Sequence, residues 1–151
     1  MKTILALVLL GATFFAGSAY AADPIVGSWT LNVAKSKFNP GPAPTAGTRV
    51  YTESAGLYTL DQKITGADGK VNSLRAQYRD GQEVKDPDGA ASTVAKKVNA
   101  NTWVFEVKMD GKVVGHVHRV VSHDGKVLTV HNTGRQGDRA PADDTMVFDR
   151  Q

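Results

Sequence analysis

Residues 102–118 read TWVFEVKMDGKVVGHVH and decide the fold. Trp103, Phe105 and Val107 alternate with mostly polar neighbours, which is the period of a β-strand with one buried face. Asp110-Gly111 then interrupts the alternation. An Asp-Gly pair between two alternating segments is a strong hairpin signal, because glycine adopts the positive φ that tight turns require. The stretch therefore predicts an antiparallel hairpin.

The same turn signal recurs along the chain, at Asp68-Gly69, Asp80-Gly81, Asp88-Gly89, Asp110-Gly111 and Asp124-Gly125. Around these turns we place ten strands, at 25–33, 48–54, 57–65, 71–78, 82–85, 92–98, 102–109, 112–122, 126–132 and 145–150. An open sheet of so many twisted strands is unusual, so the sheet should close on itself. We predict an all-β protein, an antiparallel up-and-down β-barrel of about 8–10 strands with little helix.

Three segments interrupt the strand pattern. Residues 34–47 contain three prolines and are expected to form a loop or lid. Residues 86–91 form a turn-rich connection, and the polar segment 133–144 is expected to be a mobile loop before the last strand. None of the three is long enough to link two domains.

The first 21 residues have the features of a secretory signal. Lys2 is followed by an apolar run over 4–16, and Ala19-Tyr20-Ala21 has the form of a signal-peptidase site. The run is shorter than the ~20 residues of a membrane span, so we expect no membrane span once the signal is cleaved. An uncleaved N-terminal anchor is the alternative. We predict a bacterial Sec-type signal peptide over 1–21, a periplasmic or secreted location, and a single β-barrel domain over 22–151.

Composition excludes several classes of protein. The chain of 151 residues has no cysteine, which excludes disulfides, thiol catalysis and cysteinyl metal sites. Its net charge of +3 comes from bases spread along the sequence, with no basic block, so nucleic acid is a poor candidate partner. We expect a monomer that folds without a cofactor.

The register of the hairpin over 102–118 decides where two histidines point. With a two-residue turn, Trp103 lies opposite His118 and Phe105 opposite His116, so both imidazoles share the apolar inner face. A one-residue bulge in the turn would direct both imidazoles to solvent.

The valines show which face of the strand is apolar, because odd-numbered and even-numbered residues point to opposite faces. Val114 and Val120 share the parity of the histidines, and we favour the inward register for that reason. Val113, Val117 and Val121 form an almost equally good apolar set on the other face, so the outward register stays open.

The next turn raises the same question for His131. A two-residue turn at Asp124-Gly125 would place His131 opposite His118, whereas a bulged turn would place Val130 there and direct His131 outward. Leu128 and Val130 have the character of core residues, so we favour the bulged turn and an outward His131.

The inward aromatic residues have two interpretations. They form either a packed core or the wall of a cavity, since barrels of this strand number often hold one small ligand. In the second interpretation the histidines are polar handles, and Arg75 is expected to point outward. The candidate ligand-binding residues are Trp29, Tyr58, Tyr78, Trp103, Phe105, His116 and His118.

Nothing in the sequence assigns a catalytic residue, because no nucleophile elbow, carboxylate pair or phosphate-binding glycine loop is present. His116-x-His118 has a spacing that zinc sites use, and His131 could supply a third ligand. One alternative is therefore a metal-dependent hydrolase or isomerase, although we predict no metal. Another is a structural or interaction module of the cell envelope.

Several short motifs resemble those of known barrels. Gly27-Ser28-Trp29-Thr30-Leu31 resembles the Gly-x-Trp signature that opens lipocalins and fatty-acid-binding proteins. Ser36-Lys37-Phe38 and the C-terminal strand over 146–150 extend the likeness to the latter. The chain also resembles, over its whole length after residue 21, a group of small exported bacterial proteins of this lipocalin-like or fatty-acid-binding-protein-like (calycin) type. The resemblance implies a fold and assigns no enzymatic activity.

Two departures from the lipid-binding proteins bear on the ligand. Residues 34–47 are too short and proline-rich for their pair of helices, and Met146 and Phe148 replace their closing Arg-x-Tyr pair, which grips a carboxylate. A ligand is therefore expected to be more neutral, or to be anchored elsewhere, for example at His116 or His118. We predict an exported, non-catalytic barrel that binds or carries a small hydrophobic molecule.

Overall fold

The computed structural model describes residues 22–85, 91–135 and 140–151. They form one antiparallel ten-stranded sheet and a single 3-10 turn, η1, at Val33–Lys35. The strands are β1 (Gly27–Leu31), β2 (Ala46–Ser54), β3 (Leu57–Thr65), β4 (Val71–Tyr78), β5 (Glu83–Lys85), β6 (Ser92–Asn99), β7 (Thr102–Met109), β8 (Lys112–Val121), β9 (Val127–Gly134) and β10 (Ala142–Arg150).

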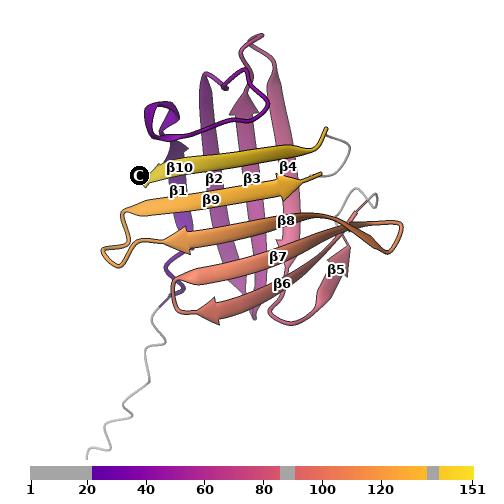
Figure 1. Cartoon of the computed structure of the whole chain (residues 1–151). Helices are drawn as coiled ribbons and strands as arrows, with labels where there is room; N and C mark the ends of the chain where they lie inside the picture. Colours follow the sequence, from indigo (N-terminus) through magenta and orange to yellow (C-terminus); the bar gives the residue numbers. More distant parts are fainter. Residues whose placement is uncertain (1–21, 86–90, 136–139) are drawn as a thin grey trace, which may run out of the picture.

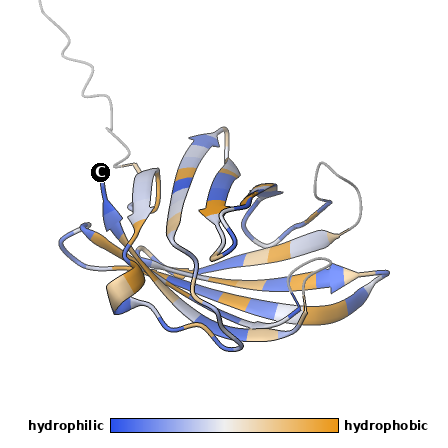
Figure 2. Cartoon of the chain, turned by 90° about the horizontal axis from the view of Figure 1, so that it is seen from above, coloured by the Kyte–Doolittle hydropathy of each residue, from blue (hydrophilic) through white to orange (hydrophobic). Residues whose placement is uncertain are grey.

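The sheet folds round into a nearly closed barrel. Its strand order is β4-β3-β2-β1-β10-β9-β8-β7-β6-β5, so β1 pairs with β10, consecutive strands pair everywhere else except between β4 and β5, and these two are the edges of the sheet. The two ends of the sheet meet where Gly81 donates its backbone N–H to the Ala95 carbonyl at 2.8 Å. In Figure 1, β1–β4 stand almost upright behind β6–β10, which cross them at a steep angle. Figure 2 shows the two layers from above.

The fold class and all ten strands expected from the sequence are confirmed. The main difference is at the end of the chain, where β9 and β10 extend through Gly134 and from Ala142 and pair there. The predicted loop over 133–144 is therefore shorter than expected. The signal peptide over 1–21 and the turn at Asp88-Gly89 lie outside the described residues.

The β7–β8 hairpin combines a tight turn with a bulge. Asp110 and Gly111 both have positive φ, at 50° and 73°, and Met109 pairs with Lys112, so the predicted two-residue turn is confirmed. Beyond the turn the register shifts, and Val114 is the extra residue on β8. Because one inserted residue reverses the facing of all that follow, the inward register predicted for the histidines is wrong.

Two glycines accommodate this bulge. Gly115 pairs with Gly134 on β9, and a Cβ atom on Gly134 would lie 2.5 Å from the Val114 carbonyl oxygen. That oxygen accepts the backbone N–H of Arg135 at 2.7 Å. The bulge is thus stabilised from the neighbouring strand, a long-range contact that the hairpin sequence alone does not contain.

The β8–β9 pairing also differs from expectation. His118 lies opposite His131, and Val130 lies opposite Arg119, so the register favoured from the sequence is wrong. The facing that it predicted is nevertheless right, because Leu128 and Val130 are fully buried and His131 is on the outside. The Val114 bulge directs His118 outward, so His118 pairs with the outward His131, while the facing of the β9 residues is as predicted.

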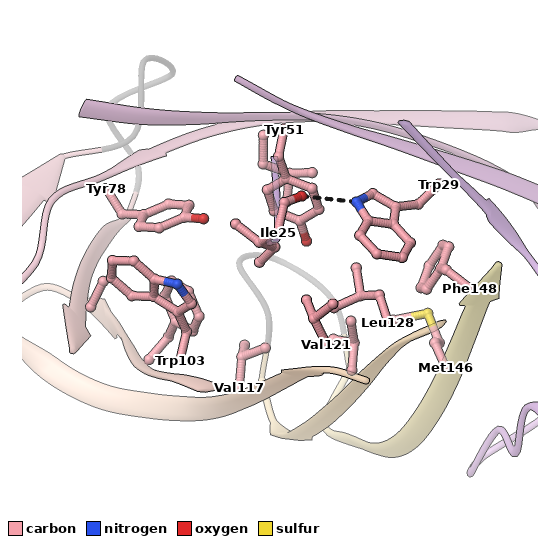
Figure 3. Packing of buried hydrophobic residues seen from close by; sticks show 14 of the residues in the cluster. Ile25, Trp29, Tyr51, Tyr78, Trp103, Val117, Val121, Leu128, Met146 and Phe148 are labelled. Atoms are coloured by element: carbon pink, nitrogen blue, oxygen red, sulfur yellow. Dashed lines mark hydrogen bonds between the residues drawn. The ribbon is translucent and has the colours of Figure 1, made fainter. Parts of the chain in front are cut away.

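Large side chains fill much of the barrel (Figure 3). At one end Tyr78 stacks on Tyr58 with ring centroids 5.1 Å apart, and the edges of Trp103 and Phe105 pack against Tyr78 at 5.3 and 4.9 Å. The remaining core residues are Ile25, Trp29, Leu31, Tyr51, Leu60, Ala95, Val107, Val117, Val121, Leu128, Val130, Met146 and Phe148.

The chain closes the barrel end that carries the termini of the described part. Trp29 donates its Nε1 proton to the Ile25 carbonyl at 2.9 Å, which folds the segment before β1 under the core (Figure 3). Arg150 lies over the Trp29 ring at 4.2 Å and donates to the carbonyl oxygens of Pro24 and Val26. This end is held by side chains that satisfy backbone carbonyls.

A proline-containing loop lies at the opposite end. Residues 36–45 connect η1 to β2, as the sequence predicts for this segment. Lys37 and Thr145 exchange two backbone hydrogen bonds of 2.7 and 2.8 Å, and Asn39 donates its N–H to Asp144 Oδ1 at 2.8 Å. The loop is therefore fastened along β10.

Candidate functional site

The barrel contains a cavity of about 250 Å³ beneath this loop. Inward-facing residues of β2, β3, β4, β8, β9 and β10 line it, and the loop covers its outer side with Phe38, Pro40, Pro42 and Pro44. Its polar lining residues from the strands are Arg49, Gln62, Arg119, Asn132 and Asp144. The cavity is thus lined by both apolar side chains and several polar groups, and such polar groups can orient a ligand.

Two arginines point into the barrel because of strand alternation. On β2 the residues Gly47, Arg49 and Tyr51 share the buried face, and on β8 Arg119 lies between buried Val117 and Val121. The exposed fractions of Arg49 and Arg119 are only 4% and 8%. Arginines are seldom buried to this extent without a paired group.

Aromatic rings surround the Arg119 guanidinium. Its Cζ atom lies 4.0 Å from the centroid of Phe105, 5.4 Å from that of Tyr51 and 5.5 Å from that of Tyr78. Among the described residues, no carboxylate pairs with Arg119, and its Nε and Nη1 atoms have no hydrogen-bond partner. Ring faces attract the cation, but they do not accept these protons as a carboxylate would.

Arg49 lies nearby on the same inner surface. It donates from Nη1 to the Tyr51 hydroxyl at 3.2 Å, and its Cζ atom lies 4.8 Å from the centroid of Phe148. Gln62 is also buried, and its Oε1 has no hydrogen-bond partner in the described part of the chain. The polar part of the cavity lining therefore consists of two guanidinium groups, the Asp144 carboxylate and the side-chain amides of Gln62 and Asn132.

Burial keeps the nearby phenol neutral. It raises the pKa of Tyr78 far above its ordinary value, and the Arg119 charge opposes this only in part. A guanidinium does not lose its proton in proteins, so the inner surface remains cationic. A bound anion would lower the free-energy cost of burying this positive charge away from water.

The five aromatic residues expected to face inward do so, but they serve mainly as packing. Trp29, Tyr78, Trp103 and Phe105 are almost fully buried, and Tyr58 packs against the same core. The lining of the 250 Å³ cavity consists of other residues. Phe105 and Tyr78 lie directly behind Arg119 and so form its support.

The two histidines of the predicted site lie elsewhere. His116 pairs with Glu106 and His118 with Val104 on the outer face, and both side chains are exposed. The expectation that they would be polar handles inside the barrel is wrong, because the Val114 bulge directs them outward. Arg75 points outward as expected and pairs with Asp61 at 3.3 Å.

The outer surface over β6–β9 has a hollow of about 450 Å³ that includes His116, His118 and His131. His131 is engaged by Asp143, with Nε2 and Oδ1 2.7 Å apart. In the part of the chain that the structure describes, no three histidine, aspartate or glutamate side chains are placed to hold a metal ion. The geometry therefore gives the metal-site alternative no support.

Sequence reasoning missed Arg49 and Arg119. The available signal was the second valine set, because choosing Val117 and Val121 as the buried residues places Arg119 between them on the inner face. Arg49 has the parity of Tyr51, whose aromatic ring suggests the core. A positive charge at each position argued against burial, and only the assembled barrel shows that both are enclosed.

Comparison with solved structures defines the class of fold. The fluorescent protein UnaG matches at a TM-score of 0.58 with 16% identity, over 87% of this chain and 100% of its own. A Schistosoma mansoni fatty-acid-binding protein in complex with arachidonic acid matches at 0.57 with 15% identity, over 85% and 96%. Zebrafish ileal bile-acid-binding protein in complex with cholic acid matches at 0.53 with 10% identity, over 85% and 99%.

The chain therefore has the fatty-acid-binding-protein fold, a nearly closed antiparallel barrel with an internal cavity. No protein-family model and no curated sequence matches it. None of the described helical segments is long and apolar enough to cross a membrane.

Proposed function

We propose that this protein binds one small hydrophobic molecule that carries an anionic group, inside the barrel and without catalysis. The observation that carries the proposal is Arg119, a buried arginine that lines the cavity and forms no ion pair with a carboxylate among the described residues. A carboxylate in the cavity would compensate this charge, and the aliphatic lining would cover the rest of the ligand.

The solved structures of similar fold support the same chemistry. The Schistosoma mansoni protein holds arachidonic acid and the zebrafish protein holds cholic acid, and both of these ligands are hydrophobic carboxylic acids. The Arg-x-Tyr pair of the lipid-binding proteins is replaced here by Met146 and Phe148. A cation lies instead on β8, at Arg119, so the ligand need not be neutral, as the sequence alone suggested.

We further propose that the barrel is exported to the periplasm or secreted, and acts there as a monomer. The support is the signal-like sequence over 1–21, which lies outside the described residues. Fractionation of the native host and mass measurement of the mature chain test this. A mature chain that begins at Ala22 supports export, whereas a chain retained in the cytoplasm with residues 1–21 contradicts it.

Binding is tested by calorimetric titration of delipidated protein with carboxylates and the matching primary amides. We expect the carboxylates to bind more tightly, and Arg119→Gln to weaken carboxylate binding by about 10-fold to 100-fold with little effect on amides. Arg75→Gln is the matched control, because Arg75 is a surface arginine, and it should leave both affinities unchanged.

The outcomes separate the parts of the proposal. Equal affinity for acid and amide would contradict the anionic group, and absence of any binding would contradict the ligand-binding function. Mass spectrometry of the recovered ligand tests the non-catalytic role, since a chemically altered ligand would contradict it.

A further inference from the structure

One part of the barrel interior is packed with aromatic rings, and another part holds the cavity. Tyr58, Tyr78, Trp103 and Phe105 fill the packed part with contacting rings. Arg119 lies at the boundary, since it packs on Phe105 and Tyr78 and also lines the cavity. Arg119 therefore lies between these aromatic rings and the cavity.

Register places Arg119 at the inner end of the cavity. Counted along β8 from the turn at Asp110-Gly111, Val117 comes first and Arg119 follows, and both line the cavity. Val121 comes next and belongs to the packed core. The carboxylate of a bound ligand would thus lie deep in the barrel, with its tail directed toward the proline-containing loop.

That loop limits the outward reach of the tail. Its prolines cover the cavity, and it is fastened to β10 by the hydrogen bonds of Lys37 and Asn39, including Asp143 N–H to the Asn39 carbonyl at 2.7 Å. A tail longer than the cavity would have to break these contacts or leave through the open side of the cavity into water, where its methylenes gain nothing.

The volume sets the size of the ligand. Because a buried cavity of about 150 Å³ accommodates benzene, each non-hydrogen atom needs about 25 Å³. The cavity of about 250 Å³ then holds about ten such atoms. Octanoate is of this size, whereas palmitate is nearly twice as large.

We propose that compact monocarboxylates, of the size of octanoate or a substituted benzoate, fill the cavity, so that the additional length of a long-chain fatty acid adds no affinity. This inference rests on the proposed binding function and adds the size class of the ligand. Within the cavity each added methylene should raise affinity about fourfold, and beyond its capacity the gain should stop.

The experiment is a calorimetric titration of the delipidated wild-type protein with butyrate, hexanoate, octanoate, dodecanoate and palmitate below their micelle concentrations. We expect affinity to rise about fourfold with each methylene up to octanoate and to show no further gain for dodecanoate and palmitate. A continuous rise to palmitate would overturn the size limit while leaving the binding function intact. If no carboxylate binds at all, the binding function itself fails.

A variant tests the cause of the limit. Met146 lines the cavity, so Met146→Ala removes side-chain atoms there and should shift the chain length at which the gain stops upward by two to three carbons, or roughly the volume lost. Met109→Ala at the β7–β8 turn is the matched control and should leave this chain length unchanged. Val117→Ala, a smaller deletion, serves if the Met146 variant is unstable, and an unchanged chain length in both cavity variants would overturn the proposal.

Discussion

The Cζ atom of Arg119 lies 4.0 Å from the centroid of the Phe105 ring, on the inner face of the barrel. The ring attracts the cation and fixes its plane, but leaves Nε and Nη1 without an acceptor among the described residues. The guanidinium is therefore buried with donors that lack acceptors among the described residues, which lowers the stability of the fold. This arrangement connects the core packing with the proposed ligand.

Replacement of Arg119 should separate stability from binding. Arg119→Met removes buried donors that lack partners, so without ligand the free energy of unfolding should rise by about 1–2 kcal/mol while carboxylate binding is lost. Urea unfolding followed by Trp fluorescence measures the first effect. A large loss of stability would show that Arg119 is a structural residue.

Arg150→Met provides the contrasting control. Arg150 donates to the carbonyl oxygens of Pro24 and Val26 and covers the Trp29 ring. Its removal should lower the free energy of unfolding by about 1–3 kcal/mol and leave carboxylate affinity unchanged. The two arginine variants should thus move in opposite directions.

Removal of the two outward histidines should leave ligand affinity unchanged. In the double variant His116→Ala/His118→Ala, carboxylate affinity should be the same as in the wild type within about twofold, because both imidazoles lie on the outer face. Calorimetry measures the affinity, and metal analysis of the purified wild-type protein accompanies it. Stoichiometric metal that disappears in the variant would revive the metal-dependent alternative.

The sequence was sufficient for the fold because strand alternation and Asp-Gly turns are local signals. β3, β4 and β7 begin and end at the predicted residues, and the turn at Asp110-Gly111 has the expected length. These features depend on short-range chemistry, namely alternating burial and the positive φ of glycine.

The site was not predictable in the same way. The bulge at Val114 depends on Gly134, a residue on the next strand whose lack of a side chain permits close approach. That single insertion exchanged His118 for Arg119 on the inner face. A one-residue change of register redirects every later side chain. Burial of Val114 and Val120 would have placed the histidines inside the barrel, whereas the observed burial of Val117 and Val121 places Arg119 there.

Burial of Tyr78 predicts a loss of stability at alkaline pH. Its pKa is raised above the ordinary value of 10.0, so the folded state holds the phenolic proton more tightly than the unfolded state. This contribution is complete below pH 10.0 and is lost as pH rises toward the folded pKa. Unfolding free energy measured through this range should fall less steeply in Tyr78→Phe, and an identical slope would contradict the assignment.

The bulge itself can be tested with two glycines of nearly equal φ. Gly134 and Gly69 have φ values of 75° and 77°, but a Cβ on Gly134 would lie 2.5 Å from the Val114 carbonyl oxygen, whereas Gly69 has open space around it. Gly69→Ala should therefore lower the free energy of unfolding by only about 1–2 kcal/mol, the effect of positive φ alone. Gly134→Ala should lower it by about 2 kcal/mol more, because the backbone of β8 must move. Urea unfolding gives both values, and equal losses would mean that the close approach of β8 and β9 at the bulge does not constrain the fold.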